Sequence, residues 1–302
     1  MPGAQTARYG GNTVCVEVRL VDETVLILDG GTGIRELGKS LAREGIARPL
    51  HLLLTHLHWD HIMGLPFFRP LYQRDAHLIV HPMWTAEQRR IVKERILFDG
   101  VHFPVRAADI PSTMEFLDVC GPSFRIGSAT IRRIALNHPG SAQGFRIDDD
   151  DGSSLAYLTD NELSPPRDAV TTLDELAQFA SGVDLLVHDA QYLAPDMPAK
   201  LGWGHSTVDD VLRLAEKAET PHLILFHHDP DRDDDSLDAV GEASSRWMWS
   251  HAPETKVTVA REGLVLGPRA SARPPPGRSP SGATGGAGTG GGGTGGGGTR
   301  NA

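Results

Sequence analysis

The sequence predicts an α/β protein in which two β-sheets pack together between layers of helices, a four-layer αββα sandwich. Short apolar runs of strand length, bounded by turn residues, alternate along the chain with segments of helical periodicity. Strand pairs and helices in the first half are followed by more strands and helices in the second half. We therefore expect two sheets, each covered by helices on its outer face.

The first half begins with two predicted strands, residues 13–20 and 24–29, which are joined by the turn "VDE". Residues 33–45 carry apolar side chains at helical spacing and end at a glycine, which predicts a helix. Residues 51–55, "HLLLT", form a continuous apolar run, as in a strand buried on both faces. Residues 85–96 predict a second helix.

In the second half, four strands are expected to build the second sheet: residues 114–119, 129–136, 144–148 and 154–160. Two further apolar runs predict buried strands, residues 183–189 and 221–228. Helices are predicted at residues 206–219 and 234–252, the first with a good N-cap. Residues 256–260 and 263–267 predict a closing hairpin.

The chain has 302 residues, 39% of them hydrophobic, and no linker divides it before residue 267. We predict one domain over residues 1–268 and a disordered Pro/Gly-rich tail over residues 269–302, which has too few apolar side chains to form a core. Two cysteines, no secretory signal and no membrane-spanning run favour a soluble, cytoplasmic protein. The net charge of −10 argues against a broad nucleic-acid surface.

Histidines and carboxylates cluster where predicted strands end. The stretch "LLLTHLHWDHIMG" holds four such side chains directly after a buried strand. The full set is His56, His58, Asp60, His61, His138, Asp160, His188, Asp189, His227 and His228. Ligands of layered α/β folds collect outside such strand ends. Imidazole and carboxylate suit zinc, with manganese or iron as alternatives. If seven of these side chains are ligands, they are too many for one tetrahedral ion but suit two ions about 3.5–4 Å apart.

The motif "THLHWDH" resembles the signature of the metallo-β-lactamase superfamily, Thr/Ser-His-x-His-x-Asp-His, and the resemblance extends over residues 9–267. The resemblance implies the metallo-β-lactamase fold and two divalent metal ions. It implies a first metal site of His56, His58 and His138, a second of Asp60, His61 and His227, and Asp160 as the bridge. The stretch "LFHHD" favours His227 over His228 as the ligand, because it resembles a stretch of the phosphodiesterase branch that places the ligand first.

Three shorter stretches, "HDAQY", "LGWG" and "HST", resemble the ribonuclease Z and cyclic-nucleotide phosphodiesterase branch. That resemblance implies a catalytic His205, with Asp189 beside it. In a two-metal mechanism, Asp60 and Asp160 are expected to orient the attacking hydroxide. Family members usually begin with one more strand, so we expect either that the first sheet lacks an edge strand or that the start codon is wrongly placed. The basic and glycine-rich arm with which ribonuclease Z holds transfer RNA is not found here, which lowers the expectation of a nucleic-acid partner.

These features predict a two-metal hydrolase that cleaves a small anionic phosphodiester, such as a cyclic nucleotide, with metal-activated hydroxide. One alternative is hydrolysis of a thioester or lactam on the same metal centre, because the fold alone does not decide the substrate. Another is a non-catalytic metal-binding sensor. His58 argues against a diiron sensor, which carries Glu at that position, and the complete ligand set argues against a binding-only module. No membrane partner is expected, and a homodimer is one option for the assembly.

Overall fold

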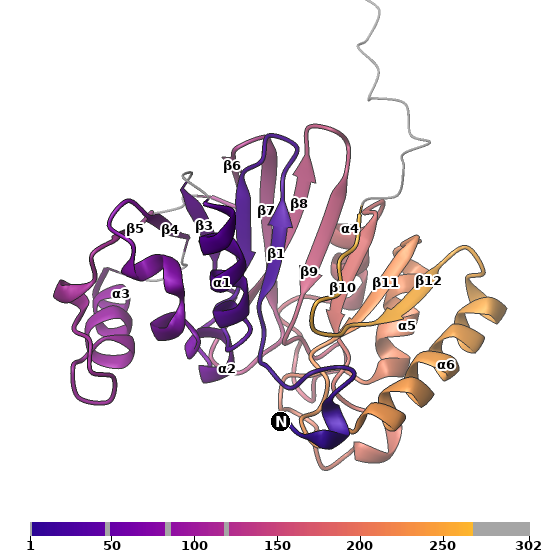
Figure 1. Cartoon of the computed structure of the whole chain (residues 1–302). Helices are drawn as coiled ribbons and strands as arrows, with labels where there is room; N and C mark the ends of the chain where they lie inside the picture. Colours follow the sequence, from indigo (N-terminus) through magenta and orange to yellow (C-terminus); the bar gives the residue numbers. More distant parts are fainter. Residues whose placement is uncertain (1, 46–48, 82–85, 118–120, 268–302) are drawn as a thin grey trace, which may run out of the picture. The chain divides into compact units, whose positions relative to one another are not determined.

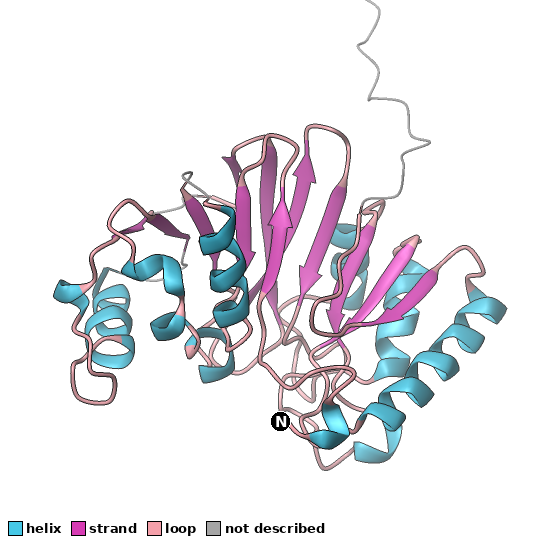
Figure 2. Ribbon diagram, viewed as in Figure 1, coloured by secondary structure: helices cyan, strands magenta, loops and turns pink. Residues whose placement is uncertain are grey.

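The computed structural model describes residues 2–45, 49–81, 86–117 and 121–267. The predicted tail lies outside these residues, and so do parts of the predicted segments 85–96 and 114–119. The described residues belong to one compact unit, Met1–Ser271. Two sheets pack against each other in this unit, with helices on their outer faces (Figure 1, Figure 2).

The first sheet has five strands in sequence order: β1 Val16–Arg19, β2 Val25–Leu28, β3 Leu50–Leu53, β4 His77–His81 and β5 Thr113–Phe116. β1 pairs with β2 antiparallel, and the following pairs are parallel. We expected residues 114–119 in the second sheet, but β5 hydrogen-bonds with β4 in the first. The period-2 pattern of a strand shows which of its side chains are buried, but not which sheet it joins.

The second sheet has seven strands in the order β12-β11-β10-β9-β8-β7-β6. Their bounds are β6 Ser123–Ile126, β7 Ala129–Leu136, β8 Ala142–Asp149, β9 Ser154–Leu158, β10 Leu185–Asp189, β11 His222–Phe226 and β12 Lys256–Val259. β6 to β9 form an antiparallel meander, whereas β9 to β12 are parallel. The predicted second strand of the closing hairpin is wrong: residues 263–267 form no strand, and Val265 at their centre is 88% exposed.

The helices are α1 Ile34–Glu44, α2 Trp59–Ile62, α3 Ala86–Ile91, α4 Leu173–Ala180, α5 Val208–Lys217 and α6 Asp234–His251. A π-helical turn, Val92–Leu97, continues α3. Short 3₁₀ segments lie at Ala4–Thr6, Leu65–Phe67, Arg69–Tyr72, Ala107–Asp109 and Ala194–Asp196. Thr207 caps α5 by accepting the backbone N–H of Asp210, one residue after Ser206, at which the predicted helix begins; the Ser206 hydroxyl donates to the carbonyl of Asn161 instead. No described helix is long and apolar enough to cross a membrane.

Three apolar cores separate the four layers. In β2, Leu26 and Leu28 face the core between the two sheets, whereas Val25 and Ile27 face the core under α1. This alternation follows from the two-residue period of a strand, and it explains why "TVLILD" is apolar throughout. A third core lies between the second sheet and α4, α5 and α6. The predicted αββα sandwich is therefore confirmed.

Candidate metal centre

The histidines and carboxylates named above come from loops at one edge of the two sheets. β7, β9, β10 and β11 run in the same direction, so the segments after them leave the second sheet at one edge. Asp29, Asp160 and His227 each follow a strand and have positive φ angles of 62°, 57° and 54°. Non-glycine residues rarely adopt this left-handed conformation, and such strain gathers at functional sites.

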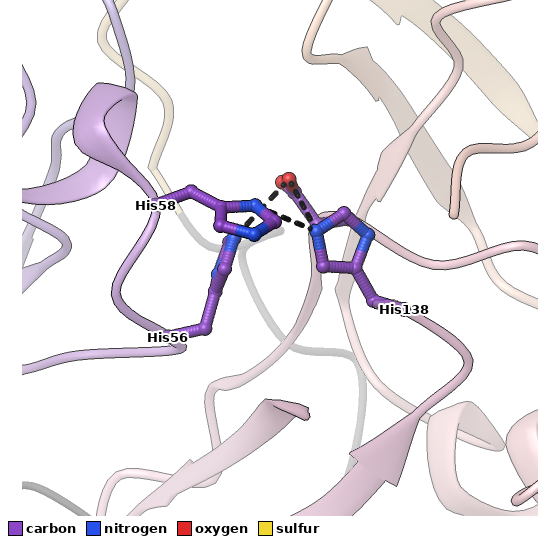
Figure 3. Close-up of side chains that lie close together, drawn as sticks. His56, His58 and His138 are labelled. Carbon is purple, nitrogen blue, oxygen red and sulfur yellow. Dashed lines mark hydrogen bonds and ion pairs between the residues drawn. The ribbon is translucent and has the colours of Figure 1, made fainter. Parts of the chain in front are cut away.

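A first group of side chains consists of His56, His58, His138 and Asp160, with one ligand-type atom of each within 4.8 Å of the others. Figure 3 shows the three labelled histidine rings converging from two segments of the chain. His58 Nδ1 lies 3.0 Å from His138 Nε2. Asp160 Oδ2 lies 3.6 Å from Nε2 of both His56 and His138. This arrangement can hold one metal ion.

A second group consists of Asp60, His61, Asp160 and His227, again within 4.8 Å of one another. Asp160 Oδ1 lies 3.2 Å from His61 Nε2 and 3.3 Å from His227 Nε2. Asp60 Oδ2 lies 3.3 Å and 3.2 Å from the same two nitrogens. The two oxygens of Asp160 therefore face different groups, which is the geometry of a carboxylate that bridges two ions.

Buried polar atoms in both groups fit metal ions. His56 Nε2 and His61 Nε2 are buried and have no hydrogen-bond partner among the described residues, although both point into the cluster. Burial lowers the pKa of His56 to about 2, so this imidazole stays neutral, as a metal ligand must. Asp160 is 1% exposed, and buried carboxylates require a positive partner.

Without metal ions, the positive charge beside Asp160 would come from protonated histidines of the second group. Burial opposes protonation of His227, yet attraction to Asp160 and the hydrogen bond with Asp60 raise its pKa to about 9. Burial likewise opposes protonation of His61, but Asp29 and Asp160 outweigh it and raise its pKa well above the usual value. The carboxylates thus favour protonated rings at His61 and His227. A metal ligand must be a neutral ring, so a bound ion would take the place of these protons. The donor set suits divalent metals that accept nitrogen and oxygen, such as zinc.

Supporting hydrogen bonds fix these rings. His61 Nδ1 donates to Asp29 Oδ2 at 3.0 Å, which leaves Nε2 facing the cluster. Asp29 also accepts hydrogen bonds from Thr55 and from the hydroxyl of Tyr157. A carboxylate behind a metal-binding histidine orients the ring and raises its basicity. The sequence interpretation missed Asp29 as a functional residue, and the only signal was a carboxylate ending the apolar run "TVLILD".

A loop that precedes α5 holds His138. His138 Nδ1 donates to the carbonyl of Gly204 at 2.9 Å. A side chain at Gly204 would place its Cβ 2.2 Å from His138 Nδ1, so this close approach requires glycine. Buried Glu162 accepts the backbone N–H groups of Gly202 and Gly204 at 2.8 and 3.0 Å. Glu162 is thus a second supporting residue that the sequence interpretation missed.

His205 and Asp189 lie beside the cluster. His205 Nδ1 is 2.5 Å from Asp189 Oδ2, and because a carboxylate can only accept, Nδ1 carries the proton. The His205 ring stacks on that of His227, with centroids 5.1 Å apart. Asp160, Asp189, His205 and His227 form a third group with ligand-type atoms within 4.8 Å of one another, so His205 is also near enough to bind an ion.

His188 and His228, which also lie at strand ends in the sequence, make hydrogen bonds outside the two metal groups. His228 Nε2 donates to the carbonyl of Ala260 at 3.0 Å, away from both metal groups. His188 is fully buried and bonds to Asn161 and to the carbonyl of Asp189. The structure therefore brings all seven predicted ligands together, with His227 rather than His228 among them.

Comparisons with known proteins agree with this geometry. Residues 24–228, more than half of the chain, match the family model of the β-lactamase superfamily domain. A protein of Mycobacterium leprae is 29% identical over 226 residues, which cover 70% of each chain. Ribonuclease Z of Halalkalibacterium halodurans is 25% identical over 234 residues, covering 63% of this chain and 72% of the enzyme.

Solved structures share the fold. The metallo-β-lactamase fold protein YhfI from Bacillus subtilis superposes with a TM-score of 0.61 at 17% identity, covering 87% of this chain and 94% of that protein. The family match spans the segments that carry all seven predicted ligands. The chain therefore belongs to the metallo-β-lactamase superfamily of hydrolases, and its relatives include ribonuclease Z.

Proposed function

We propose that this hydrolase cleaves a small anionic phosphodiester with the help of two divalent metal ions, most simply zinc. The first ion would be held by His56, His58 and His138, the second by Asp60, His61 and His227, with Asp160 bridging. The ions would supply Lewis acidity, which lowers the pKa of a water molecule and offsets the charge of the phosphoryl oxygens. Three histidines converge on one oxygen of Asp160, and two histidines with Asp60 converge on the other, which supports this assignment.

The attacking water would be oriented by carboxylates of the chain. Asp60 reaches between His61 and His227, and its side chain is 38% exposed, so it is accessible from solvent. Asp160 is buried behind it. Hydrogen bonds to these two acceptors would point a lone pair of the water oxygen at phosphorus, and alignment of this kind removes much of the entropic barrier.

The observation that carries the phosphodiester assignment is the Asp189–His205 pair beside the cluster. With Nδ1–H bonded to Asp189, the other nitrogen, Nε2, can carry the proton for a leaving oxygen. In hydrolysis the water would first release one proton to solvent, the hydroxide oxygen would then bond to phosphorus as the bond from phosphorus to the leaving oxygen breaks, and the Nε2 proton would move to that oxygen. Asp189 would stabilise the protonated ring beforehand. The relative named ribonuclease Z supports the same substrate chemistry.

The test is metal analysis of the purified protein together with a panel of esters. The panel holds bis(p-nitrophenyl) phosphate, a cyclic nucleotide, a short RNA, a thioester and a cephalosporin. We expect two ions per chain, removal of activity by a chelator, and turnover of the phosphodiesters above the other classes. Faster turnover of the thioester or the cephalosporin would overturn the phosphodiester assignment but leave the metal centre standing.

A further inference from the structure

A lysine side chain lies between two aromatic rings on the loop that leads to His205. Lys200 Nζ is 4.2 Å from the ring centroid of Trp203 and 5.6 Å from that of Tyr192. An ammonium group over an aromatic face is attracted by the negative potential of the ring. The two rings therefore restrict a side chain that would otherwise move freely in solvent.

Tyr192 connects this lysine to the catalytic region. Its ring packs edge-on against the ring of His205, with centroids 5.7 Å apart and an interplanar angle of 90°. Tyr192 is 1% exposed, and its backbone pairs with that of Ser206 and Val208, directly after His205. Lys200 and His205 thus lie against the same buried ring, and His205 is the residue that we place beside the leaving group.

Lys200 forms no ion pair with a carboxylate of the described residues. The pKa of Asp196 is lowered by the backbone N–H of Leu193, by Arg232 and, least, by the charge of Lys200. Its carboxylate binds Arg232 at 2.7 Å and the N–H of Leu193 at 2.7 Å. Lys200 is half-buried and Trp203 beside it is 57% exposed, so a ligand can reach the lysine from solvent.

We propose that Lys200 binds a second anionic group of the substrate, a carboxylate or phosphate on the leaving-group side, and that Trp203 positions the lysine for it. This inference rests on the proposed phosphodiester hydrolysis. The net charge of −10 repels anions, so an ammonium group held on the same ring as His205 would distinguish substrates by the charge of their leaving group. Selection would act on kcat/KM, because the second anion is held both before and during bond cleavage.

The experiment compares two diesters of nearly equal shape, methyl 4-carboxyphenyl phosphate and methyl 4-carbamoylphenyl phosphate. Only the first carries a second negative charge. We expect wild-type enzyme to prefer the carboxylate, and Lys200→Ala to lower kcat/KM for it roughly 10-fold, the size of one charge-assisted hydrogen bond, with little change for the amide. The matched control is Lys217→Ala, which removes the same charge from the end of α5, where Lys217 pairs with Asp174.

Trp203→Phe should keep most of the preference because it retains a ring, whereas Trp203→Ala should lose it with melting temperature and metal content unchanged. Equal effects of Lys200→Ala on both diesters, or an equal loss in Lys217→Ala, would overturn the subsite. If wild-type enzyme hydrolyses neither compound nor any phosphodiester of the panel, the proposed function fails instead. Hydrolysis of both compounds at one rate rejects only the role of Lys200.

Discussion

Replacement of His205 separates its three conceivable roles. A general acid typically contributes 10²–10⁴-fold to the rate, about 3–5 kcal/mol of transition-state stabilisation. If His205 Nε2 protonates the leaving oxygen, His205→Ala should lose this factor on an ester with a poor leaving group. The loss should shrink for p-nitrophenolate, which departs as a stable anion and gains less from a proton.

The structure also predicts what the alanine variant costs in stability. Asp189 is fully buried and accepts His205 Nδ1–H at 2.5 Å, the backbone N–H of Gln191 at 3.0 Å and that of Asn161 at 3.4 Å. Removal of the ring leaves the carboxylate with two weaker partners, which costs about 1–3 kcal/mol. For a domain of this size that lowers the melting temperature by roughly 2–4 °C per kcal/mol.

His205→Asn is therefore the better probe, because the amide N–H can still donate to Asp189 but no longer transfers a proton. We expect it to keep the melting temperature and both metal ions, yet show the same loss of turnover as alanine. The assays are metal analysis, thermal unfolding, and rates on one poor and one good leaving group. Metal loss with equal rate loss on both esters would identify His205 as a ligand. Near wild-type turnover of the poor leaving group would refute the general-acid reasoning.

Four other changes have defined outcomes. Asp29→Asn should weaken binding of one ion about 10–100-fold, because His61 loses a charged hydrogen-bond acceptor. Competition with a chelator measures this affinity, and an unchanged value would show that Asp29 has only a structural role. His227→Ala should lose an ion while His228→Ala keeps both, and the reverse result in metal analysis would exchange their roles. Truncation after Arg269 should leave the melting temperature and hydrolysis unchanged, and a drop of several degrees would show that the tail packs on the domain. Burial lowers the pKa of His81 to about 4, so the unfolded chain binds more protons below pH 6.5 and stability falls by about 2 kcal/mol between pH 6.5 and 5; in urea unfolding, His81→Leu should remove this part of the pH dependence, and an unchanged slope would contradict the assignment.

Much of the site could be predicted because its residues are unusual in a short stretch. Four ligand-type side chains in "HLHWDH" have little structural reason to follow a buried strand, so the sequence indicates them directly. Asp29 could not be recognised, because a lone carboxylate after a strand is equally typical of a turn. Its role depends on Thr55 and Tyr157, which come near it only in the folded protein.

The fold shows the same division between local and long-range information. Apolar runs such as 51–55 and 221–228 predicted buried strands correctly, because burial on both faces requires apolar side chains at every position. The assignment of residues 114–119 to the second sheet was wrong, since sheet membership depends on pairing with β4, a strand that the sequence interpretation had not identified. Strand pairing depends on residues far apart in the sequence, so the side chains of an edge strand give little information about which strand it will pair with.

The segment after β9 joins the metal centre to the His205 side of the site. Asp160 faces both metal groups, and the next residue, Asn161, donates its backbone N–H to Asp189 and accepts the Ser206 hydroxyl on its carbonyl. Glu162 then holds the loop that carries Gly204. Because these residues are consecutive, a shift of Asp160 would also displace Asn161, which hydrogen-bonds to the Asp189 carboxylate that holds His205. One stretch of backbone therefore positions both the proposed bridging ligand and the partner of the proposed general acid, and this accounts for the burial of its residues although they lie in a loop.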